Sequence, residues 1–169
     1  MRRQLRELLA AGDLDEVVRL AENRTRVLGD LLPFTYDPDA AMAWRAVEAT
    51  GAAAARVAEL DPDAVRQHLR RLYWLISEES GGICWRAPEV MAEIVRRRPD
   101  PYGDYIPIIL HLLVEMAEED LAHFRAGVLW AIGRLGPVAA DQVGDVLPAI
   151  TAALHHPDPQ VRGMAVWAL

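Results

Sequence analysis

The chain has 169 residues, a formal net charge of −7 and 52% apolar side chains, and all 18 of its basic residues are arginine. Such an acidic chain is a poor general binder of nucleic acid, because binding phosphates requires a basic face. The single cysteine excludes an intramolecular disulfide, and no apolar run reaches the roughly 18 residues that a membrane span needs. We therefore expect a cytoplasmic protein that does not enter a membrane.

The first half of the chain is predicted to be a series of helices separated by turns. Apolar spacing predicts helices over residues 3–11, 13–22, 26–32, 40–56 and 62–76. Asp13 is the expected N-cap of the second helix, since an aspartate oxygen accepts a free backbone N–H there. Asp61 and Pro62 open the fifth helix, because proline is favoured at the first helical position. Two-residue alternation of β-branched and aromatic side chains is absent, which disfavours a sheet.

The second half continues in the same way. Helices are predicted over residues 84–97, 104–117, 121–135, 142–155 and 159–169. The run Arg96-Arg97-Arg98 ends the first of them, where the helix dipole favours cations. The segment Pro99–Gly103 is predicted to be a linker, because its proline and glycine residues are typical of loops.

An internal repeat links these helices. Arg162 and Trp167 lie 37 residues after Arg125 and Trp130, and Arg86 lies 39 residues before Arg125. The period over the whole chain is 37 to 43 residues, and each unit contains one helix, a turn and a second helix. One such hairpin cannot bury its apolar face alone, so successive hairpins are expected to stack.

The repeat resembles the HEAT repeat family, in the short bacterial form called PBS-lyase-like. The resemblance rests chiefly on the last unit, where Pro148 matches the first-helix proline and Val161-Arg162 matches the Val-Arg pair that follows a turn at Asp158-Pro159. It implies an all-α fold, a right-handed α-α superhelix of about four helical hairpins.

The same resemblance implies a single HEAT-like domain over residues 1–169. Its expected parts are N-terminal capping helices at 1–23 and repeats at 24–60, 61–99, 100–136 and 137–169. The last repeat is expected to be incomplete, because the sequence ends inside a helix on the apolar residues Trp167 and Leu169. Truncation or a missing cap is favoured over coverage of that end by a partner.

The densest functional chemistry lies in the segment SEESGGICWRAPE, residues 77–89. The candidate binding residues, from this segment and its repeat equivalents, are Glu78, Glu79, Ser80, Cys84, Trp85, Arg86, Glu89, Arg125 and Trp130. Each also has an ordinary structural interpretation: the arginines hydrogen-bond between repeats, the tryptophans pack in the core, and the carboxylates, with Glu93, are solvated or form salt bridges. No complete catalytic set, metal site or cofactor motif is present, so we expect neither cofactor nor metal.

The favoured function is a protein–protein interaction scaffold that binds another protein or a peptide segment on its concave face near residues 78–89. The alternative is a small-molecule or enzymatic role, like that of the bilin lyases, centred on the same segment, although the sequence favours a protein that is not an enzyme. A third interpretation, a glycosylase-like HEAT protein that grips DNA, needs a basic groove. The sequence predicts neither the partner's identity nor the oligomeric state.

Overall fold

The computed structural model describes residues 1–76, 86–115 and 121–169, and every regular element within these ranges is helical. The all-α class predicted from the sequence is confirmed. Five of the predicted binding residues lie outside the described residues: Glu78, Glu79, Ser80, Cys84 and Trp85. The chain divides into two compact units, Met1–Arg86 and Ala87–Leu169, which are described separately below.

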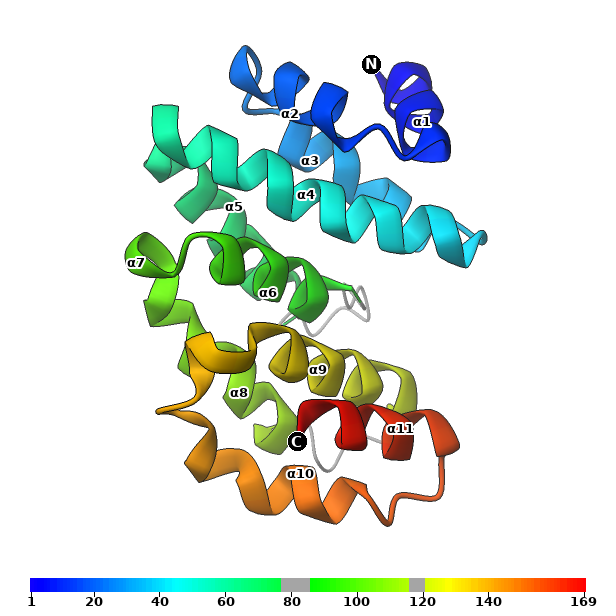
Figure 1. Ribbon diagram of the computed structural model, residues 1–169, viewed down its shortest axis with the longest axis vertical. Helices are drawn as coiled ribbons and strands as arrows, with labels where there is room; N and C mark the ends of the chain where they lie inside the picture. The colour runs from blue at the N-terminus through cyan, green and yellow to red at the C-terminus, as the bar shows by residue number, and fades with distance from the viewer. Residues whose placement is uncertain (77–85, 116–120) are drawn as a thin grey trace. The chain divides into compact units, whose positions relative to one another are not determined.

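Unit 1 is organised around one long helix (Figure 1). Its elements are α1 (Arg2–Ala11), α2 (Leu14–Glu22), α3 (Val27–Leu31), the 3-10 helix η1 (Leu32–Tyr36), α4 (Ala40–Leu60) and α5 (Pro62–Ile76). All the other elements of the unit pack against α4. Its buried residues are mostly alanines, such as Ala46 and Ala53, and their small side chains let neighbouring helices approach closely.

Polar side chains fix the helix ends in unit 1. The Asp13 side chain accepts a hydrogen bond from the backbone N–H of Glu16 at 3.0 Å, so the predicted N-cap is confirmed. At the other end of α1, Arg45 of α4 donates to the carbonyl oxygens of Leu9 and Ala10, at 3.1 and 2.8 Å. The Leu9 carbonyl also accepts from the backbone N–H of Gly12 at 3.2 Å, and the guanidinium adds a side-chain donor that ties the end of α1 to α4.

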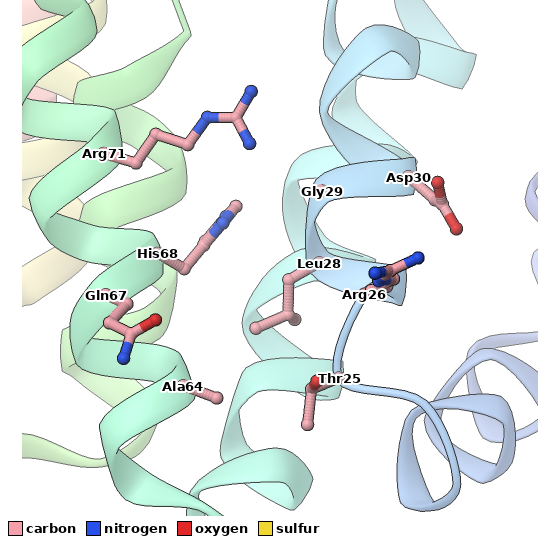
Figure 2. A pocket seen from close by; sticks show the side chains of 9 residues that line it. All are labelled: Thr25, Arg26, Leu28, Gly29, Asp30, Ala64, Gln67, His68 and Arg71. Carbon is pink, nitrogen blue, oxygen red and sulfur yellow. The ribbon is translucent and has the colours of Figure 1, made fainter.

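A cleft of about 540 Å³ opens in unit 1 between α3 and α5 (Figure 2). It is lined from the α3 side by Thr25, Arg26, Leu28, Gly29 and Asp30, and from α5 by Ala64, Gln67, His68 and Arg71. None of the predicted binding residues lies in it.

Unit 2 consists of stacked helices, in keeping with the predicted helical hairpins. Its elements are α6 (Ala87–Arg97), α7 (Pro99–Tyr102), the 3-10 helix η2 (Gly103–Tyr105), α8 (Ile106–Glu115), α9 (Ala122–Leu135), two 3-10 turns η3 (Gly136–Ala139) and η4 (Val143–Val146), α10 (Leu147–Ala153) and α11 (Pro159–Ala168). Helix α9 packs on α6, α8 and α11, and α11 packs on α10. The second helices of successive hairpins, α6, α9 and α11, thus form one layer (Figure 1).

Two boundaries in unit 2 differ from those predicted. The expected linker Pro99–Gly103 contains helix α7, because a proline at the first helical position lacks only an N–H that has no helical partner. Tyr102 is fully buried and anchors this turn to the core. The helix predicted from residue 142 begins with a 3-10 turn, and its α-helical part starts at Leu147, directly before Pro148.

Candidate functional site

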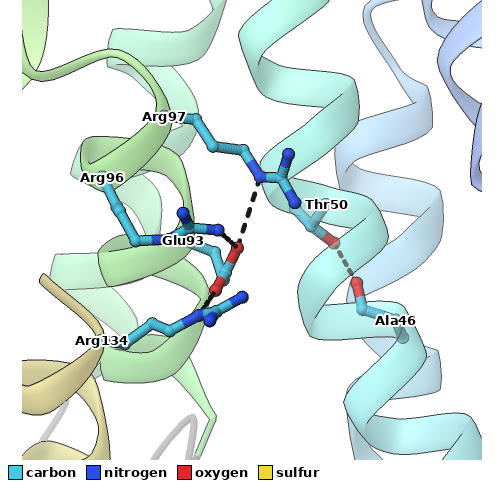
Figure 3. A network of polar contacts seen from close by, with 6 residues as sticks. All are labelled: Ala46, Thr50, Glu93, Arg96, Arg97 and Arg134. Atoms are coloured by element: carbon cyan, nitrogen blue, oxygen red, sulfur yellow. Dashed lines mark hydrogen bonds and ion pairs between the residues drawn. The ribbon is translucent and has the colours of Figure 1, made fainter.

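The strongest cluster of charges in unit 2 surrounds Glu93 of α6 (Figure 3). One carboxylate oxygen accepts hydrogen bonds from Arg96 at 3.1 Å and from Arg97 at 3.3 Å, both in the last turn of the same helix. The other oxygen accepts from Nε of Arg134, which comes from α9. The carboxylate is 1% exposed, whereas the three arginine side chains are about one-third exposed.

This arrangement gives Glu93 a structural and an electrostatic role. A buried carboxylate is stable only when charged partners and hydrogen bonds replace its lost hydration. Three guanidinium groups provide that compensation, and the bond to Arg134 joins α6 to α9. Three guanidinium groups from two helices therefore gather around one buried carboxylate on this layer.

Glu89, one turn before Glu93, is also fully buried against α9. A Cβ atom placed on Gly127 of α9 would lie 2.6 Å from Oε1 of Glu89, closer than a Cβ atom approaches a non-bonded atom. The absence of a side chain at Gly127 therefore makes room for the Glu89 carboxylate. Of the two predicted environments, solvated or salt-bridged, Glu93 has the salt bridge, and Glu89 is buried and therefore not solvated.

Tryptophans join the next pair of second helices. Nε1 of Trp167 in α11 donates a hydrogen bond to the carbonyl oxygen of Trp130 in α9 at 3.2 Å. The Trp167 ring lies against Gly133, where a Cβ would also come within 2.8 Å of the Trp167 carbonyl oxygen. Trp167 remains 51% exposed, and the guanidinium of Arg134 lies 5.9 Å from the centre of the Trp130 ring. The predicted core role of Trp167 is therefore only partly met.

The repeated arginines do not all occupy equivalent positions. Arg125 and Arg162 are each the fourth residue of their helices, α9 and α11, as the repeat predicts. Arg86 directly precedes α6, and its guanidinium stacks at 4.4 Å from the centre of the Trp44 ring in unit 1. Stacking of this kind is favourable because the ring face carries partial negative charge.

Among the described residues, Arg162 bonds within its own hairpin and not to a neighbouring repeat. It donates to the carbonyl oxygens of His156 and Pro157 at 2.8 and 2.7 Å, in the turn that precedes α11. The side chain of Asp158 caps the same helix by accepting from the backbone N–H of Gln160 at 2.7 Å. The predicted bond between repeats is thus wrong for Arg162, because its long side chain folds back over the turn.

Sequence reasoning missed Arg134, although a signal for it was present. Glu93 and Arg134 are 41 residues apart, Glu89 and Gly127 are 38 apart, and Trp130 and Trp167 are 37 apart. Each contact therefore joins residues one repeat period apart on adjacent second helices. A search for opposite charges separated by one period would have paired Glu93 with Arg134.

Comparison with known proteins agrees with this geometry. Residues 122–169, which contain α9, α10 and α11, match the family model of the HEAT-like repeat. These residues are thus similar to a HEAT-like repeat. The matched segment includes the tryptophan contact between α9 and α11 and the turn held by Arg162.

Two longer proteins are also similar to this chain. An uncharacterized protein of Archaeoglobus fulgidus is 30% identical over 111 residues, which make up 66% of this chain and 55% of that protein. The crystal structure of an archaeal HEAT-like repeats protein from Thermococcus onnurineus NA1 matches with a TM-score of 0.44 and 19% identity, over 99% of this chain and 63% of the other. The chain therefore spans a little over half the length of the curated relative.

Other kinds of site have less support in the described residues. No group of three or more histidine, cysteine, aspartate or glutamate side chains within residues 1–76, 86–115 and 121–169 is placed to hold a metal ion. Within the same ranges no helix is both long enough and apolar enough to cross a membrane.

Proposed function

We propose that this protein is an interaction scaffold whose unit 2 binds an acidic segment of a partner protein. The proposed surface, here called the arginine–tryptophan face, consists of Arg96, Arg97, Trp130, Arg134 and Trp167. These residues come from the three second helices α6, α9 and α11. HEAT-like hairpins characteristically present such a layer as an extended binding surface.

The observation that carries this proposal is the gathering of three partly exposed arginines around one buried carboxylate. The buried carboxylate of Glu93 holds three guanidinium groups in place, and each arginine keeps about a third of its side chain exposed. Arginines positioned in this way lose little further side-chain entropy when they bind carboxylates of a partner. Guanidinium–carboxylate bonds are charge-assisted and directional, which favours an acidic peptide as the ligand.

Trp167 adds an apolar contact beside the charges. Its ring is 51% exposed, yet the hydrogen bond to the Trp130 carbonyl and the contact with Gly133 fix its position. Tryptophan and arginine are the residues that most often dominate the binding energy of protein interfaces. We therefore expect the preferred segment to combine acidic residues with at least one apolar side chain.

The test is the binding of a fluorescein-labelled peptide of alternating glutamate and leucine, followed by fluorescence anisotropy. The double variant Arg96→Gln/Arg97→Gln should weaken binding at least about tenfold, or about 1.4 kcal/mol. The matched control, Arg2→Gln/Arg24→Gln, makes the same change in net charge at exposed positions of unit 1 and should leave the affinity within about twofold. Equal losses in both variants, or no loss in either, would refute the proposal.

The binding surface predicted near residues 78–89 stays a separate prediction. Binding there would involve Trp85 and Arg86, and the substitutions Trp85→Ala and Arg86→Ala test it in the same assay. If these substitutions weaken binding and those at Arg96 and Arg97 do not, the partner site belongs to the 78–89 segment. The cytoplasmic location, the bacterial origin and the PBS-lyase-like subtype are likewise predictions from the sequence.

A further inference from the structure

The cleft between α3 and α5 in unit 1 contains a buried imidazole with an unsatisfied nitrogen. His68 is 8% exposed, and its Nε2 has no hydrogen-bond partner among the described residues. A buried polar atom in this condition is unfavourable, and such atoms are rare in folded proteins. Figure 2 shows the His68 ring extending from α5 into the cleft, toward the α3 side.

Arg71 lies one turn further along α5 and extends into the same cleft (Figure 2). It makes no ion pair within the part of the chain that the structure describes. Burial, and secondly the positive charge of Arg71, lower the pKa of His68 to about 4. The imidazole is therefore neutral near pH 7, and Nε2 can carry a proton and donate it in a hydrogen bond.

We propose that this cleft binds a small molecule through an oxyanion group, a phosphate or a carboxylate, seated between His68 and Arg71. The guanidinium supplies the charge and a fork of donors, and Nε2–H of the imidazole supplies one more donor. The anion thereby satisfies the buried nitrogen and offsets the uncompensated charge of Arg71.

The rest of the cleft suits a small organic molecule. Its volume of about 540 Å³ is in the range of pockets that hold metabolites. Thr25 and Gln67 offer a hydroxyl and an amide for polar substituents, and Leu28 and Ala64 offer apolar contact. Arg26 and Asp30 also line the cleft, but Figure 2 shows their side chains directed away from α5, so they do not compete for the anion.

This inference is independent of the arginine–tryptophan face, because the cleft lies wholly in unit 1. The cleft has several donors that meet no acceptor within the described residues. In unit 2, in contrast, Glu93 already provides an acceptor for Arg96, Arg97 and Arg134. A small free anion is thus expected to favour the cleft over the arginine–tryptophan face.

The test is a titration of the ¹⁵N-labelled protein at pH 7 with inorganic phosphate and, in parallel, with acetate, at constant ionic strength. The histidine ring signals are recorded by NMR, and the signal of His68 is identified by its loss in His68→Gln. The His68 signal should shift saturably, with half-saturation in the millimolar range, while that of exposed His111 should not. Tighter binding of phosphate than of acetate would identify a phosphate ligand, and the reverse a carboxylate.

Two variants of α5 decide whether the shift is specific. Arg71→Gln should raise the half-saturation concentration at least tenfold, whereas Arg70→Gln, an exposed neighbour outside the cleft, should leave it unchanged. A His68 signal that does not move, that moves linearly with both anions, or that responds equally in the two variants would overturn the proposal.

Discussion

Glu93 and His68 are both buried ionisable residues, but their surroundings are opposite. Glu93 in unit 2 accepts from three arginines at a closely packed junction of α6 and α9. His68 in unit 1 faces a cleft and has a nitrogen that no described group satisfies. The comparison indicates that the first residue fixes the positions of its neighbours, whereas the second leaves a nitrogen unsatisfied by the described residues, as the proposed anion site requires.

The largest expected effect follows from removing the carboxylate of Glu93. Glu93→Ala leaves three guanidinium groups without their shared anion, and breaking a buried ion pair costs about 3 to 5 kcal/mol. The arginines are partly exposed and can turn toward water, so we expect a loss of about 3 kcal/mol in the free energy of unfolding. Urea denaturation followed by circular dichroism measures it.

The control for this prediction is Glu7→Ala in unit 1. Glu7 pairs with Arg3 at 3.0 Å on the exposed surface of α1, where such a pair contributes below about 0.5 kcal/mol. If Glu93→Ala lowers the free energy of unfolding by no more than Glu7→Ala does, the ion pairs of Glu93 contribute no more to stability than an exposed surface pair.

The second prediction concerns the pH dependence of stability through His68. The unfolded state gains a proton near pH 6.5, whereas the folded state gains it only near pH 4. The stability that depends on neutral His68 is thus fully present above pH 6.5 and falls as the pH drops toward 4. At about 1.4 kcal/mol per pKa unit, the loss approaches about 3 kcal/mol.

Denaturation of the wild type and of His68→Gln between pH 7 and pH 4 isolates this loss. The variant should not show this loss of stability, while the titration of carboxylates elsewhere changes the stability of both proteins equally. The charged groups that line the cleft with His68 are Arg71 on its own helix and Arg26 and Asp30 on the α3 side. Parallel pH profiles for the two proteins would show that His68 titrates normally.

The smallest expected effects come from substitutions at two helical glycines, one at the packed junction of α6 and α9 and one beside the cleft of unit 1. In Gly127→Ala the new Cβ meets buried Glu89, and overpacking of about 2 kcal/mol outweighs a gain of about 1 kcal/mol in helix propensity. In Gly29→Ala the Cβ enters open space beside the cleft, so the protein should gain up to about 1 kcal/mol. Thermal unfolding of both variants checks the signs, and a stabilising Gly127→Ala would contradict the close packing of α6 on α9.

Local sequence signals predicted the helices well where capping and apolar spacing agreed. Helix α5 was predicted over its observed span, Pro62–Ile76, and Asp13 caps α2 as expected. The prediction of a linker before α8 was wrong. The segment contains the short helix α7, which its proline and glycine residues alone would not support, and burial of Tyr102 stabilises it. Tertiary burial there overrides local propensity.

The candidate site was predicted only in part. The repeat placed Trp130 and Trp167 at equivalent positions of α9 and α11, and they are in contact. His68 carried no sequence signal, since a histidine on the apolar side of a helix resembles any other core residue until its neighbours are known. Arg71, the second residue of the proposed anion site, is three residues away in the sequence. The cleft between α5 and α3, however, depends on how those helices pack.

The sequence by itself determined that the chain is helical and that its units recur every 37 to 43 residues, because helix spacing, caps and turns are local properties. Only the tertiary structure decided which charges meet, since Glu93 and Arg134 come together through the stacking of α6 on α9. It also decided that His68 is buried with an Nε2 atom that has no hydrogen-bond partner among the described residues. Burial and electrostatic compensation depend on distant neighbours, and no short stretch of sequence contains them.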